Sequence, residues 1–177
     1  VVINEIMYQP TVLPESEYVE LLNISDAPVT LYDGVLGLSW RFTDDPGNPP
    51  IECPIPSEEP VVLPSGQCLL LIKNLIGFTV AYGYPIDIPF VEWGAGGLSD
   101  RTEKIELARP GGDSVWLRVD RVVYSNGSQM GEFASGVDPW PLGTAGQGLS
   151  LHRIDPVAYG NDPANWKAAP PTPGRAN

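Results

Sequence analysis

Acidic and amide side chains sit between apolar residues in the first two β-like segments, residues 2–8 and 17–23. Hard cations such as Ca²⁺ prefer several oxygen ligands, and two neighbouring strands can supply them, although the spacing matches no EF-hand loop. The alternative is structural, with carboxylates at a solvated strand edge or held by Arg118 and Arg121. The candidate calcium ligands are Asn4, Glu5, Glu17 and Glu20.

Residues 44–60 form a proline-rich stretch that we expect to be a long loop without regular structure. Each proline removes a backbone donor from any sheet, and loops of this length inside a compact domain are usually functional or disordered. The loop carries a second, separate set of candidate calcium ligands: Asp44, Asp45 and Asn48.

Five tryptophans are many for a chain of 177 residues. An exposed aromatic side chain suits a glycan or a protein partner. Trp93 lies among loop residues and Trp116 is out of phase with its apolar neighbours, so these two are predicted as exposed aromatic contacts. The core of a sandwich also needs large aromatic side chains, and we expect Trp40 and Trp166 to serve there.

The sequence contains few residues in patterns that are typical of an enzyme active site. The only histidine, His152, is expected on a strand beside Arg153, where a structural role is the simpler interpretation. The chain has no Gly-x-Ser-x-Gly elbow, phosphate loop or CxxC pattern. We therefore expect a protein that is not an enzyme and needs no cofactor, with calcium as the alternative.

Composition and charge argue against a nucleic-acid-binding protein and against a membrane-spanning one. The net charge is −12, and residues 1–59 hold 11 acids against the single base Arg41. Such an acidic chain repels phosphate backbones, so a nucleic-acid partner is not expected. No apolar run approaches the roughly 18 residues that a membrane span needs. The chain opens directly on a β-like segment, as a processed exported protein or an excised domain would.

Short alternating apolar segments separated by glycine and proline predict an all-β domain. Strict alternation in the first segment places Ile3, Glu5 and Met7 on one face. A change of phase near Asp120 predicts a β-bulge in a long strand, residues 115–124. We expect a β-sandwich over residues 1–154, with 44–60 as an inserted loop, and an extended tail over residues 155–177 that packs back through Trp166.

The order of several short motifs resembles the lamin tail domain family, in its bacterial secreted branch. The resemblance implies an immunoglobulin-like β-sandwich and covers nearly the whole chain. The chain departs from the family in the 44–60 insertion and in His152, which stands where an acidic residue is common. The motifs are Ile3-Asn4-Glu5-Ile6, Glu17-Tyr18-Val19-Glu20-Leu21, Leu63-Pro64-Ser65-Gly66, Gly112-Asp113, Val119-Asp120 and Gly148-Leu149-Ser150-Leu151.

In an exported protein, Cys53 and Cys68 are expected to form a disulfide. It would close a loop of roughly 15 residues and stabilise the fold by about 3 kcal/mol on the chain-entropy model. Two buried free thiols are the alternative.

The resemblance implies a non-catalytic structural or interaction module of a larger exported protein, secreted or at the cell surface. Its expected partners are other domains of the same polypeptide or extracellular proteins, with neither nucleic acid nor membrane among them. A ligand-binding module for calcium or a glycan is the alternative. An enzyme is the least supported function.

Overall fold

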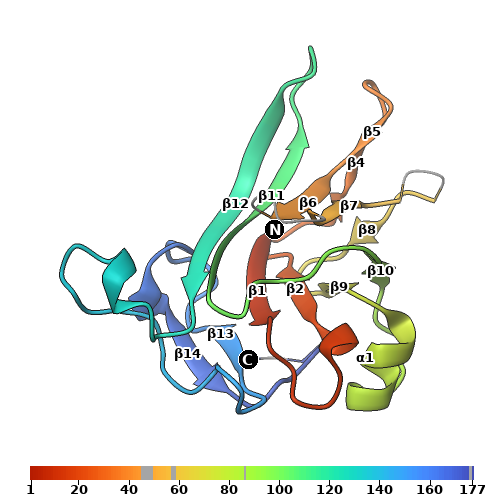
Figure 1. Ribbon diagram of the computed structural model, residues 1–177. Helices are drawn as coiled ribbons and strands as arrows, with labels where there is room; N and C mark the ends of the chain where they lie inside the picture. The colour runs from red at the N-terminus through yellow and green to blue at the C-terminus, as the bar shows by residue number, and fades with distance from the viewer. Residues whose placement is uncertain (45–49, 57–58, 86, 176) are drawn as a thin grey trace.

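The computed structural model describes residues 1–44, 50–56, 59–85, 87–175 and 177, in which the chain is mostly β-strand with one short α-helix. The all-β prediction is therefore confirmed at this level. The described residues form a six-stranded sheet, a four-stranded sheet and two short two-stranded ladders. Figure 1 shows the two larger sheets beside one another, with the helix α1 (Leu75–Tyr82) at one side of the six-stranded sheet.

The six-stranded sheet has the order β10-β9-β2-β1-β13-β14, with β9 and β10 parallel and the other neighbours antiparallel. Its strands are β1 (Val2–Met7), β2 (Tyr18–Leu22), β9 (Cys68–Ile72), β10 (Phe90–Glu92), β13 (Ser150–Arg153) and β14 (Trp166–Ala169).

The four-stranded sheet is antiparallel and has the order β12-β11-β6-β7. Its strands are β6 (Arg41–Asp44), β7 (Glu52–Pro54), β11 (Thr102–Pro110) and β12 (Trp116–Ser125). The two ladders pair β3 (Val29–Thr30) with β8 (Val62–Leu63) and β4 (Tyr32–Asp33) with β5 (Leu38–Ser39). Three short 3₁₀ turns complete the described elements: Pro14–Ser16, Met130–Glu132 and Pro163–Asn165.

One buried hydrophobic cluster draws side chains from both larger sheets, including Ile6 and Leu71 of the six-stranded sheet and Phe42 and Ile105 of the four-stranded sheet. A second, smaller cluster lies on the other face of the six-stranded sheet, where Phe78 of α1 packs. We call the face toward the four-stranded sheet the inner face, and the opposite one the outer face. Within the described residues, no helix is long and apolar enough to cross a membrane.

Two bulges set which side chains face the core. In β1 the register with β2 shifts between Ile3 and Glu5, so that Ile3 and Ile6 both reach the inner core. The prediction that Ile3 and Glu5 share a face is therefore wrong, because Asn4 is the extra residue that alternation alone does not reveal. The bulge predicted near Asp120 is confirmed, since β12 shifts its register against β11 beside that residue.

The proline-rich segment and the tail contain more structure than expected. Strand β7 forms within residues 44–60 and pairs with β6, which corrects the prediction of an irregular loop. Its Pro54 is tolerated because β7 is an edge strand. Residues 45–49 and 57–58 lie outside the described residues, and so do the candidate ligands Asp45 and Asn48. In the tail, β14 adds a strand beside β13, and Trp166 is buried as expected.

Candidate functional site

Two of the predicted calcium ligands lie directly opposite each other on the outer face. Glu5 of β1 pairs with Glu20 of β2, and both are fully buried. Their row continues across neighbouring strands to His152 and Lys167. Like charges directly opposite each other in a sheet are destabilising, so this pair needs compensating donors.

Glu5 is surrounded by hydrogen-bond donors. Its Oε1 accepts from the Tyr18 hydroxyl at 2.5 Å and the Ser150 hydroxyl at 2.6 Å, and it lies 3.2 Å from His152 Nε2. The backbone N–H of Thr172 donates to the same atom at 3.1 Å. Burial pushes the pKa of Glu5 upward, but the hydrogen bonds from its three side-chain donors outweigh burial, so the pKa is lowered.

Glu20 has fewer donors. Asn4 Nδ2 donates to its Oε1 at 2.8 Å and the backbone N–H of Gly174 to its Oε2 at 2.7 Å. Here burial dominates and raises the pKa of Glu20. Residues 170–175, which we call the C-terminal strap, thus hold both carboxylates through backbone N–H groups.

Glu17 belongs to a different contact. Lys73 Nζ lies 2.9 Å from its Oε1, and the backbone N–H of Leu98 donates to Oε2 at 2.8 Å. Burial nevertheless raises the pKa of Glu17. The structure brings together Asn4, Glu5 and Glu20 but not Glu17, and the part of the chain it describes holds no group of three or more His, Cys, Asp or Glu suited to a metal ion.

The alternative partner Arg118 does not contact these carboxylates either, because it pairs with Glu106 at 2.9 Å. The side chains of Ser150, His152 and Glu5 also fail as a catalytic relay. His152 Nε2 faces both Ser150 Oγ and Glu5, while its buried Nδ1 has no partner among the described atoms. A relay needs the two ring nitrogens to serve different partners, and His152 does not have that arrangement here.

The predicted disulfide is wrong, because Cys53 and Cys68 are both free. Cys53 packs in the inner core, and burial raises its pKa to about 12. Cys68 lies on the other face of the six-stranded sheet, where its thiol hydrogen-bonds Glu20. The sheet between them keeps the two sulfur atoms apart.

Trp93 is also corrected, since it is buried rather than exposed. It directly follows β10, and its backbone N–H donates to the carbonyl oxygen of Ile72. Its ring stacks on Phe42 with centroids 6.5 Å apart. Trp116 is half-buried on the four-stranded sheet, and the guanidinium carbon of Arg41 lies 4.1 Å from the centre of its ring.

Trp116 and Arg41 line a groove of about 320 Å³ between the β4–β5 hairpin and the strands β6, β7 and β12. Leu38 and Pro54 contribute apolar surface, and Glu52 lies on the rim with its side chain exposed. Arg41 Nε is buried and has no hydrogen-bond partner within the described residues. We call this pocket the Trp116 groove.

The ends of two hairpins beside the groove expose apolar side chains. Figure 1 shows the β4–β5 and β11–β12 hairpins projecting from the same end of the molecule. Val35 at one turn is 95% exposed, and Val115 at the other is 52% exposed. Leu38 and Leu117 are exposed as well. Clustered exposed apolar side chains mark interaction sites more often than scattered ones.

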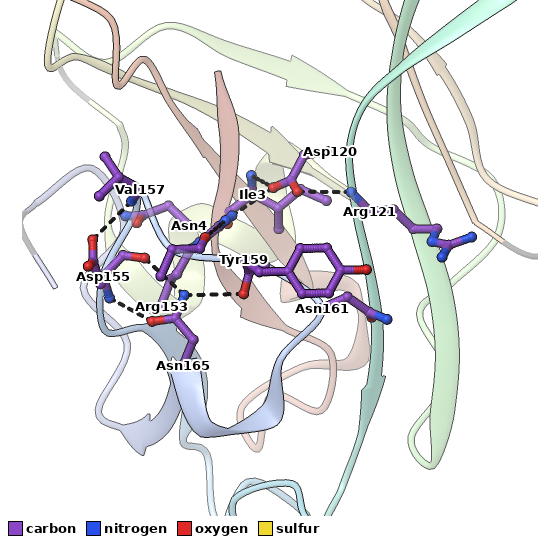
Figure 2. A network of polar contacts seen from close by, with 12 residues as sticks. Ile3, Asn4, Asp120, Arg121, Arg153, Asp155, Val157, Tyr159, Asn161 and Asn165 are labelled. Carbon is purple, nitrogen blue, oxygen red and sulfur yellow. Dashed lines mark hydrogen bonds and ion pairs between the residues drawn. The ribbon is translucent and has the colours of Figure 1, made fainter.

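The outer edge of β12 is less available to a partner, as Figure 2 shows around Asp120. The outward N–H of Arg121 donates to Asp120 Oδ1 at 3.0 Å, and that of Val123 donates to Asn161 Oδ1 at 2.6 Å. Arg153 Nη1 lies 2.7 Å from Asp120 Oδ2. Edge donors that are already bonded do not pair with another strand.

Sequence reasoning singled out Trp116 as an exposed aromatic side chain, whereas the structure has it half-buried, and it missed Arg41 and the exposed hairpin ends. One signal was present: Val35 and Leu36 stand in the turn sequence Asp33-Gly34-Val35-Leu36-Gly37, where polar residues are usual. Arg41 gave no signal, because its contact with Trp116 joins strands far apart in the chain. A scan against models of protein families finds no match, and neither does a search of curated proteins.

Proposed function

We propose that this chain is a non-catalytic interaction module of a larger exported protein, secreted or displayed at the cell surface. The observation that carries the proposal is the Trp116 groove flanked by two hairpins whose exposed ends are apolar. The buried carboxylates of Glu5 and Glu20 on the outer face accept internal hydrogen bonds and serve the fold instead.

We further propose an immunoglobulin-like β-sandwich related to the lamin tail domain family. Two sheets that share one buried cluster support this arrangement, as do the motifs around Asn4 and Glu20. A protein partner, from a neighbouring domain or another extracellular protein, suits the site better than a glycan. A glycan platform needs an open aromatic face, and Arg41 covers one face of Trp116.

Site-specific photo-crosslinking tests this proposal in the organism that makes the protein. A photoreactive amino acid replaces Val35 or Val115 at the hairpin ends, and Ile76 on α1 serves as a control of comparable exposure. We expect the same partner adduct from Val35 and Val115, and its loss when Leu38→Glu is added. Equal adducts from Ile76, or none from the hairpin ends, would contradict the proposal.

A further inference from the structure

Arg41 is the residue of the Trp116 groove whose chemistry indicates what kind of ligand would bind, because its guanidinium is a cation. Arg118 and Arg153 have carboxylate partners, and Arg101 donates to Gln129. Among the described residues, Arg41 stacks on the ring of Trp116, and its buried Nε has no acceptor there. A guanidinium that is partly desolvated and unpaired favours an incoming anion.

The geometry also prepares Arg41 for binding. Stacking on Trp116 holds the planar guanidinium in one orientation, so less side-chain freedom is lost when an acceptor binds. A planar carboxylate matches the fork of guanidinium N–H groups through two parallel hydrogen bonds. The structure thus presents a positioned cation inside a groove of an otherwise strongly acidic chain.

The other walls define what must accompany the carboxylate. Leu38, Pro54 and the exposed part of Trp116 are apolar, so they suit an apolar side chain next to the acidic one. The volume of about 320 Å³ is at the small end for binding sites, which fits a few residues of a peptide. A phosphate dianion is disfavoured because Arg41 is the only cation that lines the groove within the described residues.

We propose that the Trp116 groove binds a partner peptide through one Asp or Glu side chain that pairs with Arg41, while an adjacent apolar side chain packs on Leu38, Pro54 and Trp116. This inference rests on the proposed function and adds the chemical class of the partner. Glu52 on the rim restricts the orientation of the bound peptide, because it repels a carboxylate placed on its side of the groove.

Phage display of random 12-residue peptides against the intact chain tests the inference. We expect selected peptides to carry an acidic residue next to an apolar one, and to bind at least tenfold more weakly when that residue is changed to its amide. This comparison uses the unaltered protein, so it does not depend on the folding of any variant. Selected peptides without such an acidic residue, or no selected peptide at all, would overturn the inference.

Variants of the groove give a second measurement with the same peptides. Arg41→Gln should weaken binding at least tenfold. Arg41→Lys should weaken it severalfold, because lysine cannot form the two-point contact. Glu52→Gln should strengthen binding. Equal affinity for all three variants would contradict the inference. If hairpin crosslinks persist while no acidic preference exists, the proposed function stands and only this partner class fails.

Discussion

At the scale of single residues, burial and hydrogen-bond partners decide the roles of the acidic side chains. Glu5 and Glu20 have the same chemistry and lie opposite each other. Yet the pKa of Glu5 is lowered by its donors, whereas burial raises the pKa of Glu20. The two pKa values therefore shift in opposite directions within one desolvated site, because the two carboxylates have different sets of hydrogen-bond donors.

Neutralising these two residues should have unequal effects. Glu5→Gln leaves its donors without a charged acceptor, and we expect it to lower the free energy of unfolding at pH 7 by about 3 kcal/mol. Glu20→Gln removes the opposing like charge, and we expect a change within about 1 kcal/mol. Urea unfolding of both variants measures the difference. Similar losses would show that the two carboxylates are equivalent.

At the scale of elements, a close approach between two backbone segments sets the position of α1 against the 3₁₀ turn at Pro14–Ser16. Asn74 begins α1 by accepting the N–H of Gly77 on its side chain at 2.9 Å. Gly77 faces the 3₁₀ turn at Pro14–Ser16, where an added Cβ would lie 2.8 Å from the backbone of Glu15. The turn and the helix therefore pack together only because Gly77 has no side chain.

Gly77→Ala tests this packing against helix propensity. Alanine in a free helix is more favourable than glycine by roughly 0.5–1 kcal/mol, but here we expect a loss of about 1–3 kcal/mol from overpacking. Gly131→Ala is the matched control, because an added Cβ there meets nothing within 4 Å. The midpoint of thermal unfolding should fall for Gly77→Ala and stay nearly unchanged for the control; the reverse order would refute this account.

At the scale of the whole molecule, the buried acids shape the dependence of stability on pH. Glu17 and Glu20 have raised pKa values, so the folded state binds protons more tightly there than the unfolded chain does. Their contribution to stability therefore grows as pH falls from neutrality through their folded pKa values, which lie above 4.5. Glu5 has a lowered pKa, so its contribution is lost as pH falls through its folded value, below 4.5.

We therefore expect the free energy of unfolding to pass through a maximum on the acidic side of neutrality and then to fall. Urea unfolding between pH 7 and pH 3 measures it. The net charge of −12 also adds long-range repulsion at neutral pH, so the series needs a control. Glu20→Gln should flatten the rise while 0.5 M NaCl screens the long-range part. A steady decrease from pH 7 downward would contradict the assignment.

Local sequence patterns determined the all-β class, the position of one bulge and which strand is buried on both faces. The continuous apolar segment Cys68–Ile72 predicts burial on both faces, and Leu69 and Leu70 indeed enter different clusters. The bulge near Asp120 and the burial of Trp166 could also be predicted from the sequence, because side-chain periodicity and residue size are local properties. The all-β class follows from the spacing of such segments.

Only the tertiary structure decided the rest, because it depends on contacts between distant segments. The bulge at Asn4 turns Glu5 to the outer face, where the C-terminal strap supplies its last donor. The six-stranded sheet separates Cys53 from Cys68. Trp93 is buried because its backbone N–H continues the hydrogen bonding between β9 and β10 at Ile72. Arg41 meets Trp116 only when β6 and β12 lie in one sheet. Neither composition nor spacing encodes these distances, so the groove emerges only after folding.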